Sequence, residues 1–177
     1  MSMPSRAWSV PVRIEDVPEP GRRFELAADA ATRAALARTA GLDALPRLEA
    51  TFELTRHGSD GLQVVGTVSA TVRQTCVVTL EPVENEIEEP VNLTFVAGPG
   101  NAAAQGGDAG DLTLAGYESP EPLVNGTVNL GAVATEFLIL GIDPYPRKAD
   151  AVFAAPGGGD ATGHPFAALA ALKKPAG

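Results

Sequence analysis

The sequence predicts an α+β protein in which an antiparallel β-meander, forming a curved sheet or a partial barrel, packs against two main helices. Between residues 48 and 95, three successive stretches alternate apolar and polar side chains, which is the period of a strand with one buried face. Two further stretches have helical spacing of apolar residues and begin at a capping residue. We expect the second helix to cover the apolar face of the sheet, because that face must be buried.

The first thirty residues predict an edge strand and a turn. Residues 8–14 alternate apolar and polar side chains, as a half-buried strand does. Pro11 has no amide hydrogen to donate, so we expect this strand at the edge of a sheet. Residues 18–22 are rich in proline and glycine and predict a turn. Arg22 and Arg23 are assigned to that turn.

Three strands of the meander are predicted at residues 48–55, 62–76 and 83–95. The turn at 57–61 joins the first two, and Glu81-Pro82 separates the second from the third. Such short connections favour antiparallel neighbours. The residues expected on the buried face are Leu48, Ala50, Phe52, Leu54, Leu62, Val64, Val68, Ala70, Val72, Val83, Ile87, Val91, Leu93 and Phe95.

Two helices are predicted from their caps and their apolar spacing. Asp29 precedes the alanine-rich residues 30–40, and Gly41 follows them, so an acidic N-cap and a left-handed C-cap are expected. Asn129 is expected to cap the second helix, which ends at Gly141 before two prolines. The apolar stripe of this helix consists of Leu130, Val133, Ala134, Phe137, Leu138 and Leu140.

Two segments have too few bulky residues to form a core. Residues 98–110 are mostly Gly, Ala, Asn and Gln and predict a flexible internal loop, with order expected to return at 112–117. Residues 151–177 are rich in Ala, Gly and Pro and predict a disordered tail, in which residues 166–172 form a weak amphipathic turn or two. We therefore expect one domain over residues 1–150.

Composition excludes several classes of protein. With 45% hydrophobic and 20% charged residues, the chain is expected to fold. Its longest apolar run is much shorter than the roughly 18 residues that span a membrane, and no secretory signal is recognisable. Cys76 is the only cysteine, so no internal disulfide is expected. We expect a cytoplasmic location.

The charge is distributed unevenly along the sequence. The formal net charge is −9, and residues 74–146 contain 11 Asp or Glu and no Lys or Arg. Such a segment repels phosphate backbones, because affinity for nucleic acid depends mainly on cations. The acidic middle of the chain therefore indicates either a solvated surface or a surface for a basic protein partner.

No pattern typical of catalysis or metal binding is present. His57 and His164 lie in a predicted turn and in the predicted tail, and neither has a second His or a Cys at zinc-ligand spacing. Cys76 has no neighbouring His or Lys to lower its pKa, so a buried structural thiol is expected. Phosphate-binding loops and hydrolase elbows are absent from the sequence. We expect a non-enzymatic protein without metal or cofactor.

Glu84, Glu86 and Glu88 alternate along the third predicted strand. They should project from one open face about 7 Å apart. An exposed row lacks the desolvation or close pairing that raises a carboxylate pKa, so acid catalysis is disfavoured. These three residues are either a solvated face or a strip that binds a cationic protein partner.

The cations available for RNA are scattered. The candidate RNA contacts are Arg56, Arg73, Arg147 and Lys148. Arg56 and Arg73 fall on strands predicted to be adjacent, which would place a modest basic patch on the polar face. Aromatic residues for base stacking are few, because most are expected in the core.

Three segments stand out as motifs: residues 72–82 (VRQTCVVTLEP), residues 125–136 beginning NGTVNLG, and the proline-rich residues 143–148 (DPYPRK). In their order and spacing, which match over residues 8–150, they resemble the YceD family. The motif residues, in structural or partner-contact roles, are Cys76, Leu80, Pro82, Asn129, Leu130, Glu136 and Pro144. The family is linked to accumulation of 23S ribosomal RNA, so the resemblance implies a bacterial ribosome-biogenesis factor. The second cysteine found in many members is missing here, which argues against a shared metal role.

Three functions stay open from the sequence. The first is an assembly factor that binds a basic ribosomal protein through Glu84, Glu86 and Glu88. The second is a protein that binds ribosomal RNA directly. The third is an enzyme or binding protein for a small ligand, with a pocket under the second helix, although the sequence supplies no obvious set of convergent polar groups.

Overall fold

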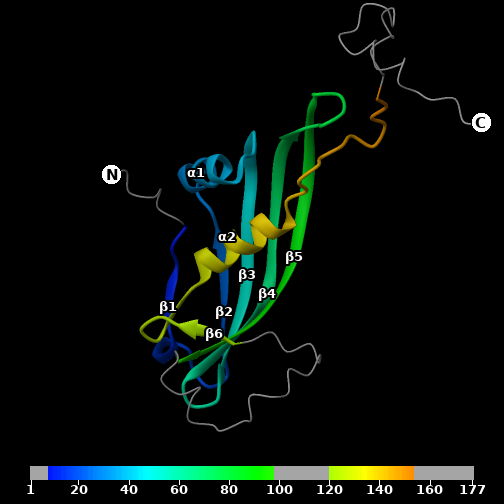
Figure 1. Ribbon diagram of the computed structural model, residues 1–177. Coiled ribbons are helices and arrows are strands. Elements are labelled where there is room, and N and C mark those ends of the chain that lie inside the picture. Colours follow the sequence, from blue (N-terminus) through cyan, green and yellow to red (C-terminus); the bar gives the residue numbers. More distant parts are fainter. Residues whose placement is uncertain (1–7, 98–119, 154–177) are drawn as a thin grey trace, which may run out of the picture.

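The computed structural model describes residues 8–97 and 120–153, and its main feature is an open, curved, mostly antiparallel sheet (Figure 1). The sheet order is β2-β3-β4-β5-β6, and only β6 runs parallel to its neighbour. The five strands are β2 (Arg22–Ala27), β3 (Ala44–His57), β4 (Gly61–Thr75), β5 (Pro82–Ala97) and β6 (Glu121–Leu123). The predicted α+β class and meander are confirmed, with an open sheet rather than a closed barrel.

The remaining elements are two helices, a short 3-10 turn and a small second sheet. These are β1 (Pro11–Arg13), η1 (Ile14–Asp16), α1 (Ala30–Ala40), β7 (Thr127–Asn129) and α2 (Leu130–Gly141). β1 pairs with β7 in the second sheet. The loop predicted at 98–110, the order predicted at 112–117 and nearly all of the predicted tail lie outside the described residues.

The long strands have one buried face, as their alternation predicts. Phe52 of β3 lies opposite Gly66 of β4, which lies opposite Val91 of β5. A side chain at Gly66 would collide with the Thr51 carbonyl, so glycine allows the close approach of β3 here. The fully buried residues of this face include Phe52, Leu54, Leu62, Val64, Val68 and Val72.

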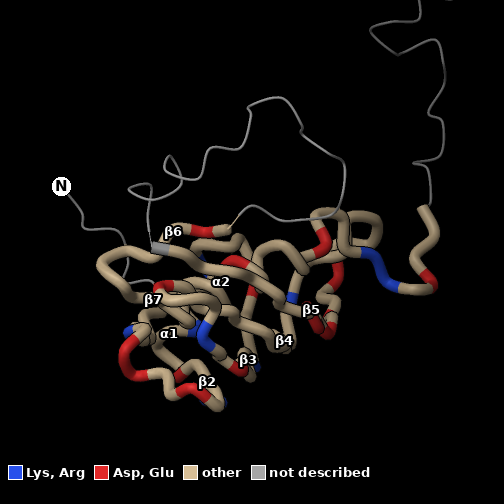
Figure 2. The backbone as a smooth tube through the Cα atoms, turned by 90° about the horizontal axis from the view of Figure 1, so that it is seen from below, with Lys and Arg blue, Asp and Glu red and all other residues tan. Residues whose placement is uncertain are grey.

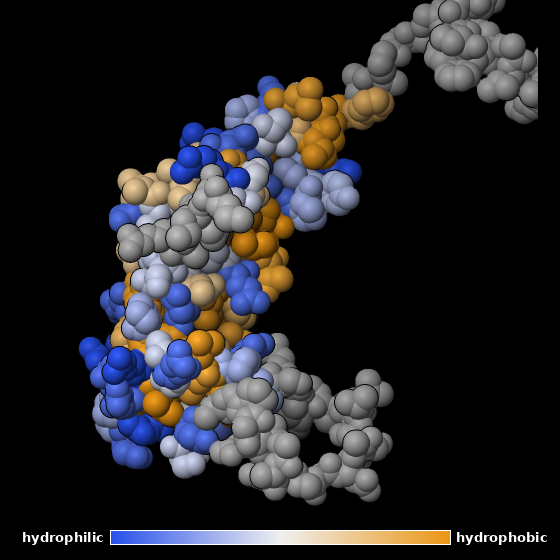
Figure 3. All heavy atoms as spheres, turned by 60° about the vertical axis from the view of Figure 1, so that its left-hand side comes forward, coloured by the Kyte–Doolittle hydropathy of each residue, from blue (hydrophilic) through white to orange (hydrophobic). Residues whose placement is uncertain are grey.

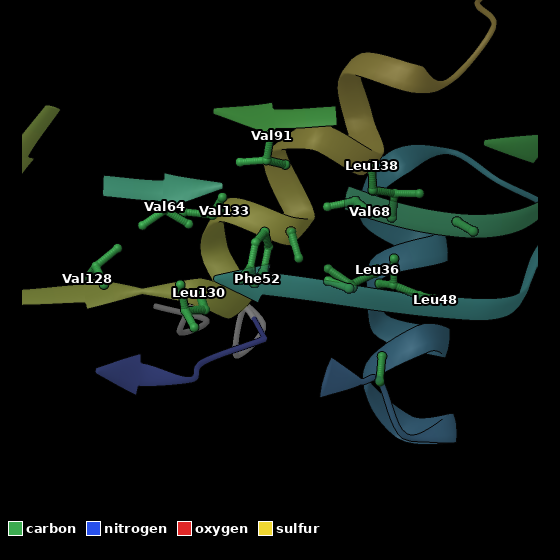
Figure 4. Close-up of a cluster of buried hydrophobic side chains, with 14 of the residues drawn as sticks. Leu36, Leu48, Phe52, Val64, Val68, Val91, Val128, Leu130, Val133 and Leu138 are labelled. Atoms are coloured by element: carbon green, nitrogen blue, oxygen red, sulfur yellow. The ribbon is translucent and has the colours of Figure 1, made fainter. Parts of the chain in front are cut away.

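α2 lies across the apolar face of the sheet (Figures 1 and 4). Leu130, Val133, Ala134 and Leu138 are buried against the strands, as predicted. The prediction for Leu140 is wrong, because its side chain is 70% exposed. Leu140 lies two helical turns after Val133, so the two side chains point to the same side of α2. At the last turn of α2, this side borders an open groove.

α1 is capped at both ends as predicted. The Asp29 carboxylate accepts a hydrogen bond of 2.7 Å from the Thr32 amide, which also lowers the pKa of Asp29. Gly41 ends the helix in the left-handed conformation, with φ of 69°. Leu36 and Ala37 bury this helix against β3.

Two predictions for the N-terminal region need correction. The strand predicted at residues 8–14 is shorter, and it lies in the small second sheet, where it pairs with β7. The turn assigned to Arg22 and Arg23 is in fact the start of β2. This strand has only two large apolar residues, Phe24 and Leu26, which lie opposite Phe52 and Ala50. A pattern that short is easily missed.

Asn129 fastens α2 to the N-terminal segment. Its Oδ1 accepts hydrogen bonds from the Val10 amide at 2.9 Å and from the Ala132 amide at 3.3 Å. Its Nδ2 donates to the Ser9 hydroxyl at 3.2 Å. One side chain therefore acts as helix cap and as the link to the residues that precede β1.

We predict that Asn129→Ala lowers the free energy of unfolding by about 2 kcal/mol, because it removes both a cap and the hydrogen bond from the Val10 amide. Asp29→Ala is the matched control, since it removes only a cap and should cost about 1 kcal/mol. Urea denaturation of the two variants measures the difference. Equal losses in both variants would contradict the linking role of Asn129.

Candidate functional site

The β4–β5 corner is the first of three candidate surfaces, and consists of residues 76–81 packed against residues 143–148. The Val77 amide donates to the Pro146 carbonyl at 2.9 Å. The Gln74 side-chain amide donates to the Asp143 carbonyl, also at 2.9 Å. The fold thus brings the motif residues Cys76, Leu80, Pro82 and Pro144 to one end of the sheet. Asn129 and Leu130 lie at the start of α2, and Glu136 lies midway along it.

Cys76 is buried in this corner and accepts hydrogen bonds from two amides. The amides of Thr79 and Lys148 each lie 3.5 Å from its sulfur. The Thr79 side chain, the Thr79 amide and the Lys148 amide lower the pKa of the Cys76 thiol to about 6. The predicted burial is confirmed. No His or Lys side chain is among the causes, as expected, but the pKa is lowered all the same, first by Thr79, three residues away, and then by the Lys148 amide from a segment far away in the sequence.

Leu80 is exposed in the same corner and has an unusual backbone conformation. Its φ is 59°, a region that costs an L-residue roughly 1–2 kcal/mol. Its side chain is 76% exposed, and Val77 and Tyr145 are also exposed large hydrophobic residues. Figure 3 shows hydrophobic atoms gathered next to the point where the described chain ends. A strained backbone and exposed apolar side chains are both typical of contact surfaces.

The polar face of the sheet is the second surface, and most of its glutamates already have partners. Glu84 forms an ion pair of 3.1 Å with Arg73. Glu86 accepts a hydrogen bond of 2.7 Å from the Thr71 hydroxyl and forms an ion pair of 2.7 Å with Arg47. Both contacts lower the pKa of Glu86. The three carboxylates share one face, as predicted. However, Glu88 is the only one without an ion pair within the described part of the chain.

The four candidate RNA contacts do not form a basic patch. Arg56 lies opposite Leu62 and Arg73 opposite Ala44, so they occupy opposite ends of adjacent strands, roughly 36 Å apart by strand geometry. Arg56 donates to the Val17 carbonyl at 2.8 Å, on the core side of the sheet. Arg147 and Lys148 belong to the corner, where Lys148 pairs with Glu81 at 2.8 Å. Figure 2 shows Lys and Arg residues dispersed among Asp and Glu residues along the described chain.

The α2 groove is the third surface, with a volume of about 810 Å³ between α2, the end of β5 and the β6–β7 region. Its apolar lining includes Leu93, Phe95, Val124, Phe137 and Leu140. Glu121 and Glu136 are its charged residues, and no described Lys or Arg lines it. A pocket under this helix is expected from the sequence, but this groove is not, because β6 and β7 are too short to show a pattern.

The charged groups of the described chain do not assemble into a metal site. No group of three or more His, Cys, Asp or Glu side chains with metal-binding geometry occurs within residues 8–97 and 120–153. Among the described helices, none is long and apolar enough to cross a membrane.

The corner, the polar face and the groove are the three candidate surfaces of the fold, and comparison with known proteins gives the family. Residues 64–173 match the family model described as "Large ribosomal RNA subunit accumulation protein YceD". The chain therefore belongs to the YceD family. No curated protein and no solved structure matched it.

The matched region differs at both ends from the span of 8–150 expected from the sequence. It omits β1, β2, α1 and β3, and it continues to residue 173. It includes β5, α2 and the corner, and also every residue that lines the groove except Pro11. The corner and the groove are therefore the surfaces within the part of the chain that defines the family.

We predict that Leu80→Gly raises the free energy of unfolding by up to about 1 kcal/mol, because glycine adopts positive φ without strain. Val77→Gly is the control, since Val77 does not have positive φ and glycine there only adds flexibility to the unfolded chain. Thermal denaturation compares the two variants. A destabilised Leu80→Gly protein would mean that the Leu80 side chain packs more than its exposure indicates.

We predict that the thiolate absorbance of the folded protein titrates with a midpoint near pH 6, and that Thr79→Val raises this midpoint, since the Thr79 side chain is the largest cause of the lowered pKa. The folded pKa lies below the unfolded value near 9. The resulting stability is therefore complete above pH 9 and is lost as the pH falls through about 6. Cys76→Ala should remove this dependence. A midpoint near pH 9 in the folded protein would contradict the prediction.

Proposed function

We propose that this protein is a non-catalytic ribosome-biogenesis factor that supports accumulation of 23S ribosomal RNA by binding a basic protein of the large subunit. Membership of the YceD family connects the chain with large-subunit RNA. The nature of the partner is inferred from the charges on the polar face of the sheet. We expect the protein to act in the cytoplasm, where ribosomes are assembled.

The observation on which the proposal rests is that each arginine of the polar face is paired with a glutamate. Arg23 pairs with Glu25 at 3.1 Å, and Arg47 and Arg73 pair with glutamates of β5. Glutamates outnumber arginines on this face, so carboxylates are left over. They include Glu53 and Glu88, which have no ion pair within the described ranges.

This arrangement favours a cationic protein over RNA as the partner. Binding to RNA needs cations that displace the counterions of phosphates, and the arginines of this face are occupied by glutamates. A face with excess carboxylates attracts a basic protein, accelerates the encounter and makes binding sensitive to salt. The exposed Leu80 and Tyr145 at the corner would add apolar contacts to such an interface.

The residues that line the α2 groove support a non-catalytic role. The α2 groove is open, and its ionisable residues are two glutamates from different elements, with no nucleophile and base side by side among its lining residues. Its other polar side chains include Asn129, whose oxygen is occupied by the amides of Val10 and Ala132. The alternative of an enzyme for a small ligand would have to use this groove.

The proposal is tested by affinity capture from lysate, with and without ribonuclease, at low and high salt. We predict that the wild-type protein captures basic large-subunit proteins after ribonuclease treatment, and that high salt releases them. Glu53→Lys/Glu88→Lys should reduce this capture. Glu19→Lys/Asp60→Lys is the matched control with the same change of charge in two turns, and should leave capture unchanged.

Two results would count against the proposal. Loss of all ribosomal material on ribonuclease treatment would favour direct binding of RNA. An equal reduction by both double variants would show that net charge, rather than the polar face, determines capture.

A further inference from the structure

Apolar side chains are exposed on α2 and on the connection beside it. Ile139 and Leu140 of α2 and Val124, between β6 and β7, are exposed, and Leu140 and Val124 are each 70% exposed. Leu140 and Val124 both line the α2 groove. A helix with apolar residues on more than one side usually has a partner on each, and an exposed apolar groove of this size marks a binding site.

We propose that the α2 groove binds residues 166–174 of the same chain, Phe-Ala-Ala-Leu-Ala-Ala-Leu-Lys-Lys, as a short amphipathic helix. These residues lie outside the described part of the structure. The inference concerns a site other than the polar face of the sheet, so it is independent of the proposed partner of that face.

The sequence of this segment is suited to an apolar groove with acidic residues. Phe166, Leu169 and Leu172 recur every third residue, which places them along one side of a helix. The intervening residues are alanines, which have the highest helix propensity. Pro165 precedes the segment, at a position where proline suits a helix start.

Charge gives the segment a second means of recognition. Lys173 and Lys174 follow the apolar residues directly. The groove offers Glu121 and Glu136, without a lining Lys or Arg among the described residues. Lysines at the end of the helix would also interact favourably with its dipole.

The connection is long enough to allow this contact. Twelve residues separate Phe153, the last described residue, from Phe166, and in extended form they reach on the order of 40 Å. Residues 142–153 first carry the chain from the end of α2 to the β4–β5 corner (Figure 1), so the twelve residues have to run back from there towards Leu140. Because the segment is tethered within the same chain, its effective concentration at the groove is raised, and weak affinity is enough.

The family match supports a common role for residues 166–174 and the α2 groove. It extends to residue 173, and so includes nearly all of the segment as well as the β5, β6 and α2 residues of the groove. The internal residues 111–118 are a poorer occupant. They contain Asp111 and Glu118 and no cation, so they would be repelled by Glu121 and Glu136.

The inference is tested by NMR on the full chain with labelled Ala, Leu and Val methyl groups. We predict that Phe166→Ser/Leu169→Ser/Leu172→Ser shifts the methyl resonances of Val124, Ala132 and Leu140, because the groove loses its occupant. Ala167→Ser/Ala168→Ser/Ala171→Ser is the matched control. It introduces the same number of serines, leaves the apolar residues in place and should give much smaller shifts.

The reciprocal variant Leu140→Glu should shift the resonances of Leu169 and Leu172 and leave the core methyl groups unchanged. The inference is overturned if the groove resonances are the same in the wild type and the first triple variant, or if both triple variants change them equally. It is also overturned if the shifts disappear on dilution, because a second copy would then be the occupant. Each of these results leaves the capture experiment on the polar face unaffected.

Discussion

The structure depends on the burial of one apolar sheet face, most of which lies beneath α2. β3, β4 and β5 present Phe52, Val64, Val68 and Val91 on the same side, and α2 covers them with Val133 and Leu138 (Figure 4). Apolar surface removed from water stabilises a fold by roughly 25 cal/mol per Å², so this contact contributes to the stability of the whole structure. The short sheet of β1 and β7 and the cap at Asn129 hold the start of α2 in place for that purpose.

Both candidate surfaces within the family match follow from the position of this helix. At its end the chain turns back over the β4–β5 connection, so that Pro146 and Lys148 meet Val77 and Cys76. On the outer side of α2 the sheet offers little cover, because β6 is short and pairs with only the last three residues of β5. The groove is the space left there, and Leu140 is exposed for the same reason.

The sequence predicted those features that depend on local periodicity or on a cap. Alternation in residues 48–95 identified the buried face, and Asp29, Gly41 and Asn129 marked the ends of the helices. β2 was missed because two apolar residues do not define a period, and its register against Phe52 is a property of the sheet. The partners of charged residues were missed for a related reason. Whether Arg47 meets Glu86 depends on the register of three strands, which no single strand determines.

The brevity of β6 has a consequence for solubility. Because β6 covers only Phe95 to Ala97, the outer edge of β5 from Pro82 to Thr94 has no neighbouring strand within the described residues. Such an edge can pair with a strand of a second molecule and start aggregation, and charged residues and proline on the edge prevent this. β5 contains Glu84, Glu86, Glu88, Glu89 and Pro90 along this stretch. These glutamates and Pro90 therefore oppose pairing of this edge with a strand of a second molecule.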